Sequence, residues 1–116
     1  MRMYAVHGQG GGSTWASPLN QLEKMMRAFN VHVYFTGHHH KSLAAAATKL
    51  DADVNHPTQL RATDARIFAG GSWLRGYLPN ETTYAEDGLM VPLAVGAPVL
   101  RVRRKNDGTF RLRVEV

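Results

Sequence analysis

The stretch that most constrains this chain is a short apolar run that ends in three consecutive histidines. Residues 31–41 read VHVYFTGHHHK. β-Branched and aromatic residues predict a strand here, and Gly37 gives the chain a place to turn. A second apolar run, residues 3–6, also ends in a histidine and a glycine, His7 and Gly8. If both strands belong to one sheet, His7, His38 and His40 meet at its carboxyl edge, where α/β sheets bind ligands.

The chain between these two runs predicts a helix. Residues 8–15 are rich in glycine and predict a loop, and Ser17 and Pro18 then predict a helix start as N-cap and first helical residue. Apolar side chains follow at helical spacing and predict a core-facing stripe that ends near Asn30: Leu19, Leu22, Met25, Met26 and Phe29. Strand, helix and strand in succession predict a βαβ unit with parallel pairing and a right-handed crossover.

The second half predicts further strands and a terminal hairpin. Helix propensity predicts a helix over the alanine-rich residues 42–50, although a buried strand against a tight neighbour would also use small residues. Residues 51–64 predict a loop and 65–69 a strand. Residues 73–97 predict irregular structure, with turn signals at Pro79–Asn80, Asp87–Gly88 and Pro92. Residues 99–104 and 109–116 alternate apolar and basic residues around Asn-Asp-Gly, which predicts a β-hairpin with one buried face.

Length and composition indicate one domain, residues 1–116, because no linker, repeat or low-complexity tract divides the chain. A hydrophobic fraction of 44% excludes the disordered and fibrous classes. No apolar run is long enough to span a membrane and the first residues do not resemble a signal peptide, so a cytoplasmic location and no membrane partner are expected. The chain has no cysteine, which excludes disulfides and thiolate metal sites.

The formal charge of +5 favours anionic partners such as phosphate esters or nucleic acid. Much of the positive charge lies in the last sixteen residues, at Arg101, Arg103, Arg104, Lys105, Arg111 and Arg113. Two interpretations remain open: a nucleic-acid patch, or the solvated face of a hairpin. Phe110 is the one aromatic residue among these basic residues, so a stacking platform is not indicated.

The histidine segments resemble the motifs of one enzyme family. Residues 37–40, Gly-His-His-His, resemble the Gly-His-x-His motif of calcineurin-like metallophosphoesterases. The earlier His7-Gly8 step is similar to the single-His motif that precedes it there, and Gly70-Gly71-Ser72 is similar to the Gly-Ser step that often follows. Within the family, the likeness is to small phage and bacterial phosphoesterases, which carry a His-Gly-x-Gly-Gly loop. The resemblance covers roughly residues 1–78.

The resemblance implies part of an αββα sandwich: a βαβ unit followed by further strands and the C-terminal hairpin. It also implies a two-metal centre of Mn, Zn, Fe or Ni that hydrolyses phosphate mono- or diesters with metal-activated water. By motif, His7 and His38 hold one ion and His40 the other, with His38 also catalytic. In an extended segment His39 points away from both neighbours, so it is not expected to be a ligand. Gly8, Gly10 and His39 are expected near the substrate.

The chain departs from the family pattern because the motifs that supply an Asp-x-His, a bridging Asp and an Asn-His pair do not precede His7. It therefore resembles the C-terminal half of a metallophosphoesterase domain, and we expect a split, truncated or degenerate form. Its missing ligands would come from a complementary N-terminal fragment or from a homo-oligomer. A permuted site using Asp51, Asp53, Asn55 and His56 is an alternative, against the interpretation of residues 53–55 as a turn.

Two further interpretations concern function. The loop at residues 8–13 completes neither a dinucleotide fingerprint nor a Walker motif, so nucleotide binding is not favoured. The alternative to a phosphoesterase is a non-catalytic module that binds nucleic acid or a partner chain through the basic C-terminal hairpin. Metal dependence separates the two, because phosphate-backbone binding should depend on salt and not on a metal ion.

Overall fold

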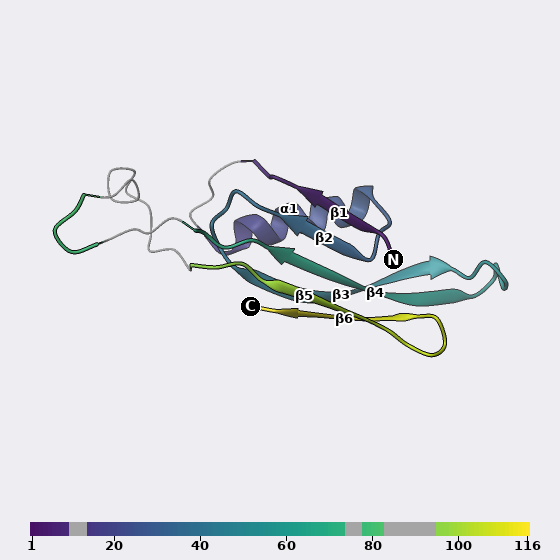
Figure 1. Ribbon diagram of the computed structural model, residues 1–116. Coiled ribbons are helices and arrows are strands. Elements are labelled where there is room, and N and C mark those ends of the chain that lie inside the picture. The colour runs from purple at the N-terminus through teal and green to yellow at the C-terminus, as the bar shows by residue number, and fades with distance from the viewer. Residues whose placement is uncertain (10–13, 74–77, 83–94) are drawn as a thin grey trace.

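The computed structural model describes residues 1–9, 14–73, 78–82 and 95–116, which form a mixed α/β fold (Figure 1). The elements are β1 (Met3–Val6), α1 (Ala16–Ala28), β2 (Val33–Thr36), β3 (Leu43–Ala52), β4 (Leu60–Ala69), β5 (Val99–Arg104) and β6 (Phe110–Glu115). The first four strands form one sheet in the order β1-β2-β4-β3, and β5 and β6 form a separate antiparallel pair. The predicted parallel pairing of β1 with β2 and the predicted terminal hairpin are both confirmed.

The sheet lies between α1 on one face and the β5–β6 hairpin on the other (Figure 1). Side chains alternate between the two faces of a strand, so each strand contributes to two small cores. Tyr34 and Ile67 pack with Leu22 of α1, whereas Val33 and Phe68 pack with Leu112 of β6. The coarse α/β prediction is confirmed, and both faces of the sheet are covered by short elements.

The helix begins earlier than predicted. α1 starts at Ala16 after Trp15, which makes no side-chain capping bond, so the assignment of Ser17 as N-cap was wrong. Pro18 is the third residue of the helix, where its missing N–H costs nothing because the first-turn amides have no intrahelical acceptor. The helix ends at Ala28, two residues before Asn30. The predicted apolar face is confirmed for Leu22 and Met25, which are buried against the sheet, whereas Phe29 follows the helix and is 43% exposed.

The alanine-rich segment is a strand, so the propensity-based prediction of a helix over residues 42–50 was wrong. β3 pairs antiparallel with β4 from Leu43 opposite Ala69 to Ala52 opposite Leu60. Ala45 packs against the helix-side core and Ala44 against the hairpin-side core. The strand is half-exposed, and its pairing with β4 along its whole length outweighs the helix propensity of alanine.

The predicted loop over residues 51–64 was also wrong, because β3 runs to Ala52 and β4 begins at Leu60. Only residues 53–59 connect the two strands. Asp53 Oδ1 accepts a hydrogen bond of 2.8 Å from the backbone N–H of Asn55, which confirms the turn. The register places this turn at the end of β3 and β4 farthest from the histidines, so the permuted site at Asp51, Asp53, Asn55 and His56 is excluded.

Several predictions fall wholly or partly beyond these ranges. Gly10, the Asp87–Gly88 and Pro92 turns and most of residues 73–97 lie outside the described residues. The turn at Pro79–Asn80 is present, closed by a hydrogen bond from Glu81 N–H to the Leu78 carbonyl oxygen. No helix in the described part of the chain is long and apolar enough to cross a membrane.

Candidate metal and phosphate site

Three parallel strands end at one edge of the sheet and carry the candidate residues there. Val6 at the end of β1 pairs with Thr36 at the end of β2, and Thr36 pairs with Ala69 at the end of β4. The segments that follow these strands are His7–Gly8, residues 37–40 and residues 70–72. Backbone N–H groups extend the pairing by one residue, from Gly37 to the Val6 carbonyl oxygen and from Gly70 to the Thr36 carbonyl oxygen. The edge therefore brings the three motifs together.

His7 and His38 form a pair across the ends of β1 and β2. His38 Nδ1 lies 3.2 Å from His7 Nε2, and the ring planes are inclined by 71°. Two nitrogens that face each other at this distance share one proton, so one imidazole donates and the other accepts. The His38 side chain is exposed, so the pair is accessible from solvent.

His40 is held separately, by Ser72. Its Nδ1 lies 3.0 Å from Ser72 Oγ, and its ring centroid is 6.4 Å from that of His38. Ser72 is 1% exposed, and its carbonyl oxygen accepts a 2.8 Å hydrogen bond from Gly96 N–H. This contact fixes the His40 ring and leaves Nε2 for another partner. Ser72 was not predicted as a site residue, although the Gly-Gly-Ser step had marked the segment.

His39 turns away from its neighbours and packs against α1. It is 7% exposed, and its Nε2 lies 2.6 Å from Gln21 Oε1, which also accepts from the Thr36 hydroxyl. His39 Nδ1 is buried and has no partner among the described residues. Burial lowers the pKa of His39, and the charges of His38, Lys41 and His40 lower it further. This position agrees with the expectation that His39 is not a ligand; that expectation and its contact with substrate both stay predictions.

The backbone through the histidines is not extended, so the geometric reason given for the alternation was wrong. His38 has φ of 67° and His40 has φ of 53°, both in the left-handed region. The N–H of His39 donates to the Gly37 carbonyl oxygen at 2.8 Å, which closes a γ-turn centred on His38. Such conformations cost about 1–3 kcal/mol each and cluster at functional sites. A γ-turn at His38 and a second positive φ at His40, rather than a pleat, direct the three side chains.

Two glycines allow the strand ends to approach closely. A Cβ on Gly8, whose φ is 89°, would lie 2.6 Å from Thr36 Oγ1. A Cβ on Gly37 would lie 3.2 Å from the His7 carbonyl oxygen. Gly8 therefore belongs to the packing of the edge whether or not it also contacts a substrate.

Lys41 anchors the histidine segment to the chain before α1. Its side chain is 5% exposed, and its Nζ donates a 2.8 Å hydrogen bond to the Thr14 carbonyl oxygen. This contact could not be predicted from the residue types, because a lysine after a polar turn is usually solvated.

The donor set fits one metal ion better than two. Tetrahedral coordination with Zn–N bonds of about 2.0–2.1 Å separates two nitrogens by about 3.4 Å, close to the 3.2 Å between His38 Nδ1 and His7 Nε2. Among the described residues no carboxylate pairs with any histidine, and no group of three His, Cys, Asp or Glu is arranged to hold a metal ion. A bridging carboxylate is thus absent from the described part of the edge.

No protein-family model, curated protein or solved structure matches the chain.

Proposed function

We propose that the edge of the sheet that carries His7, His38 and His40, here called the histidine edge, binds a divalent metal ion. We also propose that the chain is the metal-binding half of a phosphoesterase. The observation that carries the proposal is the pairing of His38 Nδ1 with His7 Nε2 at 3.2 Å, beside a His40 ring oriented by Ser72. Imidazole nitrogens such as those of His7 and His38 suit Zn, Mn, Fe or Ni as ligands.

The resemblance to calcineurin-like metallophosphoesterases suggests the reaction at this edge, which is the hydrolysis of phosphate esters. The order of the motifs, their place at strand ends and the meeting of those ends all support the likeness. A helix, two sheets and the likeness together support part of an αββα sandwich. The carboxylates of a two-metal centre are proposed to come from a complementary chain or a second copy.

Each residue has a stated part in the proposed reaction. His7 and His38 would hold the ion, which supplies Lewis acidity toward a phosphate ester and toward water. Ser72 keeps His40 in one orientation, with Nε2 free to bind a second ion or a phosphate oxygen. The described residues at the edge include no obvious general acid, so protonation of the leaving group is also assigned to the complementary chain.

The test is metal stoichiometry by elemental analysis and affinity by titration calorimetry, with Mn²⁺ and Zn²⁺ added to the metal-free protein. We expect at least one ion per chain, with binding lost in His38→Ala. His56→Ala is the matched control, because His56 lies in the turn at the opposite end of the sheet. Circular dichroism should show that both variants remain folded.

Hydrolysis is measured separately with bis(p-nitrophenyl) phosphate. We expect activity that needs added metal, disappears in chelator and in His38→Ala, and persists in His56→Ala. If the protein binds metal but does not hydrolyse the ester, the proposed metal site stands, and the proposal that the chain is an enzyme on its own is rejected. Absence of metal binding by the folded wild-type protein would reject the proposal as a whole.

A further inference from the structure

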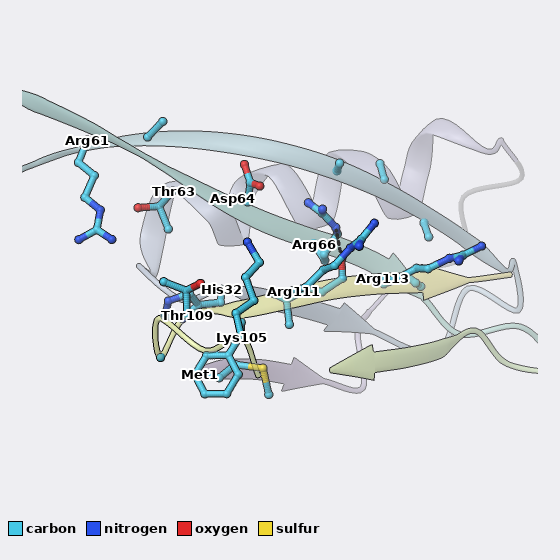
Figure 2. A pocket seen from close by; sticks show the side chains of 18 residues that line it. Met1, His32, Arg61, Thr63, Asp64, Arg66, Lys105, Thr109, Arg111 and Arg113 are labelled. Carbon is cyan, nitrogen blue, oxygen red and sulfur yellow. Dashed lines mark hydrogen bonds between the residues drawn. The ribbon is translucent and has the colours of Figure 1, made fainter. Parts of the chain in front are cut away.

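A groove lies between the hairpin side of β3–β4 and strand β6, on the face of the sheet opposite α1 (Figure 2). Its volume is about 1000 Å³. Among the described residues that line it, Asp64 is the one carboxylate. The basic lining residues come from both layers: Arg61 and Arg66 from β4, Arg111 and Arg113 from β6, and Lys105 from the end of β5. The groove is therefore strongly positive.

This positive charge is poorly neutralised within the described part of the chain. The ion pairs there both involve Glu115, at 2.9 Å from Arg101 and 3.5 Å from Arg113. The hairpin register places Arg103 opposite Arg111 and Arg101 opposite Arg113. Like charges directly opposite each other destabilise a strand pair. Glu115 offsets this repulsion for Arg101 and Arg113, whereas Arg103 and Arg111 form no ion pair among the described residues, so an anion beside Arg111 would relieve the repulsion there.

Arg66 joins the two walls of the groove. Its Nε donates to the Leu112 carbonyl oxygen at 3.1 Å, and its Nη1 donates to the Ala65 carbonyl oxygen at 3.0 Å. Figure 2 shows Arg66 beside Arg111 and Arg113, above β6. The contact holds the hairpin against the sheet, so the groove is preformed.

We propose that this groove binds the phosphate backbone of a single-stranded nucleic acid. The cations form a row rather than a point: Figure 2 shows Arg61 at one end of the groove, Lys105 between, and Arg66, Arg111 and Arg113 toward the other end. A strand with one charge per about 3.4 Å of axis matches such a row. A recess between two layers suits a single strand better than the convex surface of a duplex.

Phe110 adds a stacking surface for a nucleic-acid base, which a polyanion without bases cannot use. It lines the groove and its side chain is 41% exposed, so one base can stack on its ring. A single aromatic residue gives little sequence preference, so recognition rests mainly on phosphates. This inference does not depend on the histidine edge, which lies at the other end of the parallel strands.

The test is fluorescence anisotropy with a short labelled oligothymidylate. With four phosphate contacts, the slope of log K against log [salt] should be about −2.8, so affinity should fall about 50-fold between roughly 50 and 200 mM salt. The Arg111→Gln/Arg113→Gln variant should reduce the magnitude of the slope by about 1.4. Asp64→Asn should tighten binding, because it removes the carboxylate from the groove.

The matched control is Lys24→Gln/Arg27→Gln, which removes two exposed positive charges from α1 on the opposite face. It should leave the salt slope unchanged. Phe110→Leu should weaken oligothymidylate binding fivefold or more while leaving polyglutamate binding unchanged.

Three results would overturn the proposal. One is no binding at low salt. Another is an equal loss of slope in the α1 variant, which would mean that net charge alone governs binding. The last is binding of a duplex or of polyglutamate at least as tight as binding of the single strand, which would assign the groove to a different polyanion.

Discussion

Gly8 gives the most quantitative prediction, because its backbone and its surroundings both oppose a side chain. Its φ of 89° lies where L-residues are strained, and a Cβ would lie 2.6 Å from the Oγ1 of fully buried Thr36. A left-handed conformation costs about 1–2 kcal/mol, and overpacking costs about 1–3 kcal/mol. Gly8→Ala should therefore lower the free energy of unfolding by roughly 2–5 kcal/mol, measured by urea denaturation followed by circular dichroism.

Gly108 provides the matched control, because it has φ of 80° and no atom within 4 Å of a Cβ. Gly108→Ala should lower the free energy of unfolding only by the cost of the left-handed conformation, about 1–2 kcal/mol. The difference between the two variants then measures the packing of the strand ends. In a Thr36→Ala background, Gly8→Ala should cost less, because the closest contact is gone. Equal losses at the two glycines, or a loss at Gly8 below about 0.5 kcal/mol, would refute the reasoning.

Two further predictions concern the hairpin and pH. Leu112→Ala should cost about 2–5 kcal/mol and speed amide hydrogen exchange in β6 more than in β1, because Leu112 is the buried contact of the hairpin with β2 and β4; uniform acceleration would contradict it. Burial lowers the pKa of His32, aided by the N-terminal ammonium and Arg2, so the folded state favours the neutral imidazole. The corresponding stability should be present above pH 6.5 and decline as pH falls from 6.5 to the folded-state pKa. His32→Gln should flatten this part of a stability–pH profile, and an unchanged profile would exclude His32 as its source.

The meeting of the histidine segments could be predicted because strand direction determines it. Two strands separated by one helix must pair in parallel if they are neighbours, so their carboxyl ends share an edge. The contact by which Ser72 orients His40 could not be predicted in this way. It depends on β4 lying next to β2, and the sequence between them does not specify that order.

The error at residues 42–50 has a clear physical source. Local propensity favours a helix for four consecutive alanines, and it has no information about what will pack on them. In the fold, β4 offers a hydrogen-bonding partner along the whole of β3, and Ala44 and Ala45 pack partly against the two cores. The same limit applies to the positive φ at His38 and His40, because only a small minority of non-glycine residues adopt it even though histidine is enriched among them.

The histidine edge and the basic groove use the same sheet but should act independently. The histidines follow Thr36 at the end of β2, whereas Arg66 pairs with Val33 at its start, about 10 Å away along the strand. Arg61 lies five residues farther from the edge, and none of His7, His38 and His40 lines the groove. Since distant substitutions without shared partners usually add, His38→Ala should leave oligonucleotide affinity unchanged, and the Arg111/Arg113 variant should leave metal stoichiometry unchanged. Coupling between them would instead mean that a strand bound in the groove reaches the edge, which would make nucleic acid the phosphodiester presented to the metal site.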